Sequence, residues 1–324
     1  MKNENAQVQD DDQSIFVQSD SMSNQIVPDS EYQGIMGLLP GKFRAFALLA
    51  RFDRPIGWWL LFWPCVFGLA LSGGLIGRWD LMLWMLLGSI SMRGAGCVYN
   101  DIVDRDLDAQ VARTAARPLP SGAVSMKEAW IWLLALCSVG LAVLLQLRWE
   151  AQLVALASLA LVAAYPFMKR ITWWPQIWLG LVFSWGALVG WVAITGQFNA
   201  AMAWLYAGTI CWVIGYDTIY AMQDREDDAL VGIKSSALRL GGHIRSGVGL
   251  FYALALSGWC LAIWSIRPEK QALVALAPVA IHLMMQLFSL KSDGSNALGH
   301  FRSNRTAGLL AALAFLVVGA AGNT

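Results

Sequence analysis

Carboxylates are concentrated in two short stretches of the chain. The first acidic segment, residues 100–108, reads Asn-Asp-Ile-Val-Asp-Arg-Asp-Leu-Asp. On a helix, Asn100, Asp104 and Asp108 fall at i, i+4 and i+8 and share one face, with Asp101 three residues before Asp104. Carboxylates stacked at this spacing repel one another, so the segment calls for raised pKa values or a bound cation.

The second acidic segment, residues 217–228, reads Asp-Thr-Ile-Tyr-Ala-Met-Gln-Asp-Arg-Glu-Asp-Asp. Asp217, Tyr220, Asp224 and Asp228 again fall on one helical face, at steps of three, four and four. Both segments follow long apolar stretches. We therefore expect two acidic arms that face each other around one site.

Magnesium is the cation that suits such arms. It prefers oxygen ligands, keeps some of its waters and is completed by substrate phosphates. Two carboxylate arms would hold Mg²⁺ so that it clamps a diphosphate. The alternative is that the carboxylates are solvated charges on an interfacial loop, although acidic clusters in or beside membrane segments are usually functional.

Basic residues stand beside both segments. Arg113, Arg117 and Lys169 are suited to contact a diphosphate, because arginine binds it in bidentate fashion and lysine offers a point charge. The alternative for each is an anchor at the membrane surface, which we favour for Arg170. Arg93 lies inside an apolar segment, seven residues before Asn100, where it should face a polar cavity and pair with a substrate anion.

The elements that position these residues follow from the composition. The 324-residue chain is 57% hydrophobic and only 14% charged, with 17 Trp. This excludes a soluble enzyme, a disordered scaffold and a secreted disulfide domain. It predicts an all-α polytopic protein embedded in a lipid bilayer. A net charge of +1 indicates no nucleic-acid partner.

Nine apolar segments have the length needed to span a bilayer. We expect them near 54–75, 79–99, 128–147, 151–168, 174–195, 201–221, 247–266, 271–290 and 306–322. Residues 1–40 are polar and acidic and predict a disordered leader, so the transmembrane domain is expected over 41–324.

The distribution of basic residues orients this topology. Only Arg78, Arg148, Arg267 and Lys270 fall on one side, and Arg93 lies within a segment, while the rest of the 23 Lys and Arg fall on the other side. The positive-inside rule then places the N-terminus and the acidic segments in the cytoplasm. We expect a bacterial inner membrane.

These motifs resemble those of a known family. Residues 93–108, Arg-Gly-Ala-Gly-Cys-Val-Tyr-Asn-Asp-Ile-Val-Asp-Arg-Asp-Leu-Asp, with the Arg-Thr-Ala-Ala-Arg-Pro-Leu that begins at Arg113, are similar to the UbiA superfamily of intramembrane prenyltransferases. Residues 215–228 resemble more narrowly the members that act on 4-hydroxybenzoate in ubiquinone biosynthesis. The Arg-Phe-Asp-Arg-Pro-Ile-Gly that begins at Arg51 and the Tyr165–Arg170 stretch agree with this resemblance.

The resemblance implies nine helices around a central cavity, bound Mg²⁺, a polyprenyl diphosphate donor and an aromatic acceptor. By position it gives the catalytic, metal–diphosphate set as Asp101, Asp104, Asp108, Asp217, Asp224 and Asp228. All of these except Asp217 are expected metal ligands. It also implies that Arg93 and Asn100 bind the aromatic acid, and that Tyr165 and Tyr220 lie among the substrate contacts.

Two rival functions remain at this point. One is a prenyltransferase of the same superfamily with a different acceptor. The other is a cation-coupled transporter, since acidic residues in membrane helices suit ion transport as well. A transporter site is expected near the middle of the bilayer, whereas both acidic segments are expected at one edge. The prenyl chain length, the oligomeric state and the group that removes the ring proton are left open.

Overall fold

The structure is a computed structural model that describes residues 37–110, 112–223, 225 and 234–321. Every regular element in that part of the chain is a helix, which confirms the all-α prediction. The chain divides into two compact units. Unit 1 holds the described part of Met1–Pro55 with Gly94–Ala135, and unit 2 holds Ile56–Arg93 with Leu136–Thr324. The expected leader lies almost wholly outside the described residues and stays a prediction.

Each of the nine expected segments contains a helix. The long helices are α4 (Ile56–Leu71), α5 (Trp79–Asp108), α7 (Met126–Leu144), α8 (Trp149–Ile171), α9 (Pro175–Thr195), α10 (Ala200–Tyr220), α13 (Ile244–Ile266), α15 (Ala277–Ser289) and α16 (Ala297–Ala321). The short helices are α3 (Gly41–Leu49), α6 (Ala112–Ala115), α12 (Ser236–Leu240), η1 (Gly241–His243), α14 (Lys270–Leu273) and η2 (Val274–Leu276).

Seven helical stretches of the described chain are long and apolar enough to cross a membrane. The helix α4 is apolar but has only 16 residues, and α10 is not among the seven. An integral membrane protein is therefore supported, whereas the count of nine spans stays a prediction.

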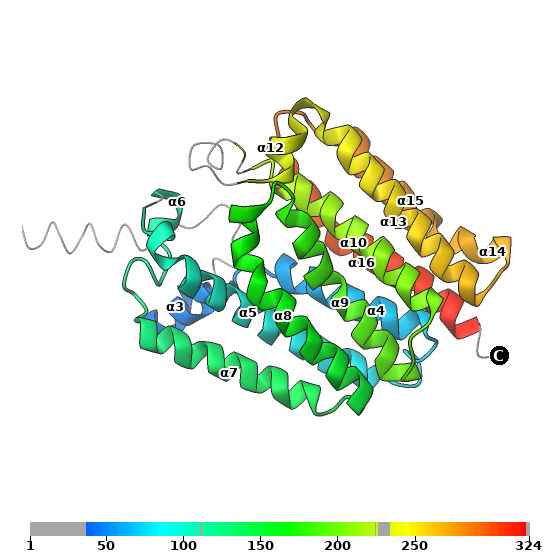
Figure 1. The fold of residues 1–324 in the computed structure, drawn as a ribbon, viewed down its shortest axis with the longest axis horizontal. Coiled ribbons are helices and arrows are strands. Elements are labelled where there is room, and N and C mark those ends of the chain that lie inside the picture. The colour runs from blue at the N-terminus through cyan, green and yellow to red at the C-terminus, as the bar shows by residue number, and fades with distance from the viewer. Residues whose placement is uncertain (1–36, 111, 224, 226–233, 322–324) are drawn as a thin grey trace, which may run out of the picture. The chain divides into compact units, whose positions relative to one another are not determined.

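Unit 2 is built on close helix pairs. The helix α10 packs on α13 and α9, while α4 packs on α9 and α16 (Figure 1). Glycines sit where the backbones meet: a Cβ on Gly190 would collide with the backbone of Cys65 in α4, and one on Gly258 would collide with Gly208 in α10. Helices in lipid gain little from burying apolar surface against each other, so small residues that allow close packing stabilise such pairs.

A cluster of buried aromatic rings holds the centre of unit 2. Phe67, Trp212, Trp259 and Phe315 are fully buried, and the Phe67 ring lies 5.2 to 5.9 Å from the other three. The Trp212 indole donates a hydrogen bond to Asn304 Oδ1 at 2.9 Å. This satisfied polar contact ties α10 to α16 and fixes the helix that carries Asp217.

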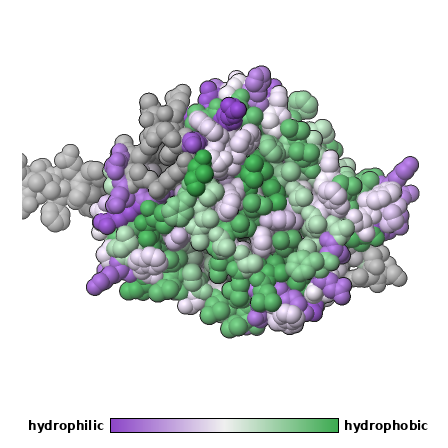
Figure 2. Space-filling view, viewed as in Figure 1, coloured by the Kyte–Doolittle hydropathy of each residue, from purple (hydrophilic) through white to green (hydrophobic). Residues whose placement is uncertain are grey.

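The surface of unit 2 is consistent with a lipid environment. Hydrophilic residues gather near α12 and near α14, at the two ends of α13, with apolar side chains between them (Figure 2). On α13 itself, Leu250, Leu254 and Leu261 are exposed. Large exposed apolar side chains along a helix are what a bilayer covers.

Candidate active site

The first acidic segment forms the C-terminal end of α5. Asp101 and Asp104 are each only 1% exposed and Asp108 is 9% exposed, whereas Asp106 on the same turns is exposed. The common face expected from the i, i+3 and i+4 spacing is therefore present, and it is the buried face. Burying three carboxylates is unfavourable unless cations or hydrogen bonds compensate.

Arg51 supplies one of these cations. Its Nη2 lies 2.9 Å from both carboxylate oxygens of Asp101, and its Nη1 donates to the backbone oxygen of Leu48 at 3.0 Å. Among the described non-glycine residues, Arg51 is the one with a positive φ, at 58°. Such a backbone costs of the order of 1 kcal/mol, and strain of this kind persists where surrounding contacts hold it.

Arg117 supplies the second cation. Its Nη1 lies 2.7 Å from Asp108 Oδ2 and 3.5 Å from Asp101 Oδ1, so that one guanidinium joins both carboxylates. The hydroxyl of Thr114 donates to the backbone oxygen of Asp108 at 2.7 Å. The chain after α5 thus folds back to place Arg117 on the acidic face, while its predicted contact with a diphosphate stays a prediction.

The charges of unit 1 act on one another. Burial raises the pKa of Asp108, the charge of Arg117 opposes that rise, and the negative charges of Asp101 and Asp104 add to it. Burial alone would lower the pKa of Arg51, but the carboxylate of Asp101 outweighs it and the pKa lies above its ordinary value. The acidic face therefore still favours added positive charge.

The donor set of the first segment fits magnesium in chemical type. Its carboxylates are hard oxygen donors, they are buried, and their mutual repulsion favours a cation. However, within the described residues no three acidic, histidine or cysteine side chains are already gathered around a common point. Asp101 and Asp108 are engaged by arginines instead, so metal binding requires these ion pairs to rearrange.

The second acidic segment begins on α10 but does not continue as one helix. The helix ends at Tyr220, and the N–H of Ala221 closes its last turn on Asp217 O at 2.9 Å. Asp217 and Tyr220 therefore share the end of α10, and both are half-buried. The end of α10 agrees with the expected segment 201–221, and the common face through Asp228 stays a prediction. Asp224 and Asp228 themselves lie outside the described residues.

Side chains from other parts of unit 2 brace the end of α10. The Tyr220 ring lies 4.5 Å from that of Phe301 in α16. Thr218 and Ser236, both fully buried, share a hydrogen bond of 2.8 Å. These contacts fix the last turn of α10, and Ser236 at the start of α12 brings the chain back after the second segment.

Arg93 lies within α5 in unit 2 and is half-buried, while the polar cavity expected beside it stays a prediction. Its guanidinium carbon lies 5.5 Å from the centre of the Phe183 ring in α9. It also crowds Gly57 in α4, where an added Cβ would come within 2.8 Å of Arg93 Nε. Glycine at this position therefore leaves the space that the arginine occupies. Asn100 is half-buried and belongs to unit 1.

For the remaining predicted residues, the structure gives the helix that carries each one but few side-chain contacts. Tyr165 is half-buried on α8, and Lys169 lies one turn later on the same helix. Arg113 lies on the short helix α6. The side chains of Arg113 and Lys169 fall outside the described part of the chain, so their predicted diphosphate contacts stay predictions.

Arg51 is a residue of this site that the sequence motifs did not identify. It lies 50 residues before Asp101, in a stretch whose motif agreed with the family resemblance but indicated no role for the arginine. A signal was present, since Arg51 and Arg54 flank a phenylalanine and an aspartate at the start of the first expected span. Charges at that position are equally well explained as membrane anchors, so the sequence alone did not distinguish an anchor from a residue of the site.

Two groups of observations now define the class of this protein: a helical membrane fold, and a buried carboxylate motif held by arginines. The model of the UbiA prenyltransferase family matches residues 61–304, and the chain belongs to this family. It is therefore a membrane-embedded transferase, and the cation-coupled transporter is not supported.

Individual relatives agree with this assignment. The chain is 46% identical to the mitochondrial 4-hydroxybenzoate polyprenyltransferase of Drosophila melanogaster over 82% of this chain and 69% of that protein. A UbiA homologue from Aeropyrum pernix superposes with a TM-score of 0.65 at 26% identity, covering 80% of this chain and 97% of that one. An Archaeoglobus fulgidus homologue bound to GPP and Mg²⁺ superposes with a TM-score of 0.62 at 19% identity, covering 86% of this chain and 99% of that one. It shares the fold.

One expectation is corrected by these relatives. The Drosophila protein and a rat relative, 39% identical over 85% of this chain, are both mitochondrial by name. The expected bacterial inner membrane is therefore not supported. The orientation of the N-terminus stays a prediction.

Proposed function

We propose that this protein transfers a polyprenyl group from a polyprenyl diphosphate to the ring carbon beside the hydroxyl of 4-hydroxybenzoate, in a magnesium-dependent step of ubiquinone biosynthesis. The observation that carries the proposal is the buried face of Asp101, Asp104 and Asp108, to which Arg51 and Arg117 are bound. The names of relatives that are 39–46% identical support the choice of acceptor.

The first acidic segment binds the donor diphosphate in this proposal. Asp101, Asp104 and Asp108, with Asp224 and Asp228 of the second segment, are the residues that would hold Mg²⁺. When bound, the metal supplies positive charge that offsets the charge of the leaving diphosphate. Arg117 moves from its carboxylate partners to a diphosphate oxygen, a contact that arginine makes well. Arg113, Lys169 and Tyr165 complete the contacts to this group.

Arg93 orients the acceptor. A guanidinium held over the Phe183 ring and bounded by Gly57 is positioned to bind the carboxylate of an aromatic acid, with Asn100 as a further contact. The apolar surroundings of Arg93 strengthen this ion pair because little water competes for either charge. Binding by the carboxylate leaves the phenol end of the acceptor free to meet the prenyl group.

The reaction balances without a redox partner. The bond between the allylic carbon and the diphosphate oxygen breaks, and the electron pair leaves with the diphosphate. The ring carbon beside the phenol hydroxyl forms the new carbon–carbon bond, and its proton passes to a carboxylate, for which Asp217 and Asp101 are the candidates. Holding the two substrates together removes much of the entropic barrier to this step.

The test uses membranes that contain the full chain, with 4-hydroxybenzoate, a polyprenyl diphosphate and Mg²⁺. We expect a prenylated hydroxybenzoic acid by mass spectrometry, and none when EDTA is added. A parallel series of other aromatic acceptors decides the rival specificity. If another acceptor reacts and 4-hydroxybenzoate does not, the chain keeps its family but the proposed acceptor is wrong.

A further inference from the structure

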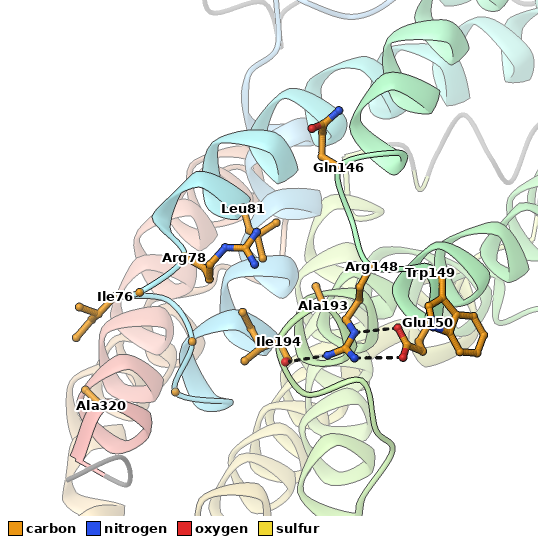
Figure 3. A pocket seen from close by; sticks show the side chains of 13 residues that line it. Ile76, Arg78, Leu81, Gln146, Arg148, Trp149, Glu150, Ala193, Ile194 and Ala320 are labelled. Carbon is orange, nitrogen blue, oxygen red and sulfur yellow. Dashed lines mark hydrogen bonds and ion pairs between the residues drawn. The ribbon is translucent and has the colours of Figure 1, made fainter.

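A cavity with a mainly apolar lining and three charged side chains in its wall lies in unit 2 at the N-terminal end of α5. Its volume is about 840 Å³ (Figure 3). Its walls come from the turn between α4 and α5, the turn between α7 and α8, and the C-terminal ends of α9 and α16. Nothing in the proposed transferase reaction uses it.

Two arginines line this cavity, and each is held by a carboxylate two residues further on. Arg148 gives Nε and Nη2 to Glu150 at 2.8 and 3.1 Å, and its Nη1 donates to Ile194 O at 3.2 Å (Figure 3). All three nitrogens of Arg148 are therefore engaged, two by Glu150 at the start of α8 and one by Ile194 at the end of α9. Arg148 is a structural residue of the wall.

Arg78 differs from Arg148 because one of its nitrogens remains available to bind a ligand. Its Nε and Nη2 each donate to Asp80 at 3.0 Å, while its Nη1 has no hydrogen-bond partner among the described residues. The Arg78 side chain is 51% exposed and lines the cavity. It can bind an anion while it keeps its contact with Asp80.

The place of the cavity indicates what kind of anion it meets. Trp149 and Ile76 line it and are 66% and 68% exposed, and Trp79, which follows Arg78 in the chain, is 63% exposed. Exposed tryptophans at the ends of membrane helices lie at the level of the lipid headgroups. The anion present there at high local concentration is the phosphodiester of a glycerophospholipid.

We propose that this cavity binds the headgroup of a glycerophospholipid, with its phosphate on Arg78. The acyl chains leave along the apolar surface beside Ile76. Glu150 and Asp80 keep the net charge of the cavity low, which favours a singly charged phosphodiester over a multiply charged free phosphate. The site adds a lipid contact that is separate from the donor and acceptor sites.

The test titrates the purified full chain in detergent with a short-chain phosphatidylglycerol and counts bound lipid by native mass spectrometry. Arg78→Gln removes the cation and should weaken binding roughly tenfold. Gly77→Trp tests the cavity itself, because a Cβ at Gly77 meets only Gly74 O, at 3.9 Å, so a large side chain enters without a backbone collision. It should also reduce binding.

Two matched variants serve as controls. Arg267→Gln removes an arginine that, like Arg78, pairs with a carboxylate two residues further on, through Nη2 and Glu269 at 3.1 Å, but lies outside the cavity. Gly299→Trp places the same bulk at another glycine with open space around it. Both should bind phosphatidylglycerol like the unmodified protein.

Two other ligands are titrated in parallel in place of phosphatidylglycerol. They are a diacylglycerol of equal chain length and inorganic phosphate. Neither should match its affinity, because one lacks the phosphodiester and the other lacks the apolar chains. Equal binding by the diacylglycerol would overturn the role of Arg78. Equal binding by phosphate would overturn the choice of a lipid. Unchanged lipid binding in both Arg78→Gln and Gly77→Trp, or an equal loss in Arg267→Gln, would also overturn the proposal.

Discussion

Arg51 Nη2 lies 2.9 Å from both carboxylate oxygens of Asp101, and the two side chains are 13% and 1% exposed. The backbone of Arg51 adopts a left-handed φ of 58° to make this contact. The motif carboxylate is therefore neutralised before any substrate arrives. This ion pair must compete with metal and diphosphate for Asp101, so it influences both the stability of unit 1 and the binding of the donor.

Removing Arg51 should destabilise the protein. Arg51→Ala leaves Asp101 buried with only the longer contact to Arg117, and breaking a buried ion pair from one side costs about 3 kcal/mol. We expect a lower thermal midpoint in detergent. Lys42→Ala is the control in the same unit, because it removes an exposed pair with Glu128. Equal midpoints for both variants would show that the Arg51 ion pair contributes nothing to stability.

Removing Asp104 should stop the reaction and leave the fold intact. Asp104→Ala takes one buried carboxylate from the acidic face, and we expect prenyl transfer to fall at least about 100-fold, as when a group that stabilises transition-state charge is lost. Asp106→Ala changes the exposed carboxylate two residues away and should retain activity. Product formation by purified protein measures both, and normal turnover by Asp104→Ala would exclude its role in the site.

Magnesium and diphosphate should stabilise the protein together. A ligand that binds only the folded state raises the thermal midpoint, so Mg²⁺ with inorganic diphosphate should raise it, and EDTA should reverse the rise. Each component alone should have a smaller effect, because the carboxylates and the diphosphate repel one another without the cation. The Asp104→Ala variant should show little of this shift. A full shift in that variant would place the metal elsewhere.

Enlarging Gly57 should weaken acceptor binding through Arg93. In Gly57→Ala the new Cβ would lie 2.8 Å from Arg93 Nε, so the guanidinium must move. We expect the KM for the aromatic acceptor to rise roughly tenfold while the KM for the donor stays near its original value. Arg93→Ala should give the same pattern more strongly.

The control for this prediction is Gly77→Ala, at a glycine with open space around it and no part in the transferase site. Its kinetic constants should match those of the unmodified protein. If Gly57→Ala raises the donor and acceptor KM equally, Arg93 does not act on the acceptor alone.

The sequence by itself determined the local features of this protein. The spacing of Asp101, Asp104 and Asp108 follows the helical period, so it predicted their common face, and the apolar segments predicted where helices form. The expected segment 201–221 also matched the end of α10 at Tyr220. The sequence did not predict which side chains contact that end, because Phe301 and Ser236 reach it from distant parts of the chain.

Only the tertiary structure decided which charges meet. The contacts of Arg51 with Asp101 and of Gly57 with Arg93 join residues that are 50 and 36 positions apart, and no periodicity along one helix encodes them. The first arises because burying the Asp101 charge is costly without a partner, and the second because a side chain at position 57 would occupy the space that the Arg93 guanidinium needs.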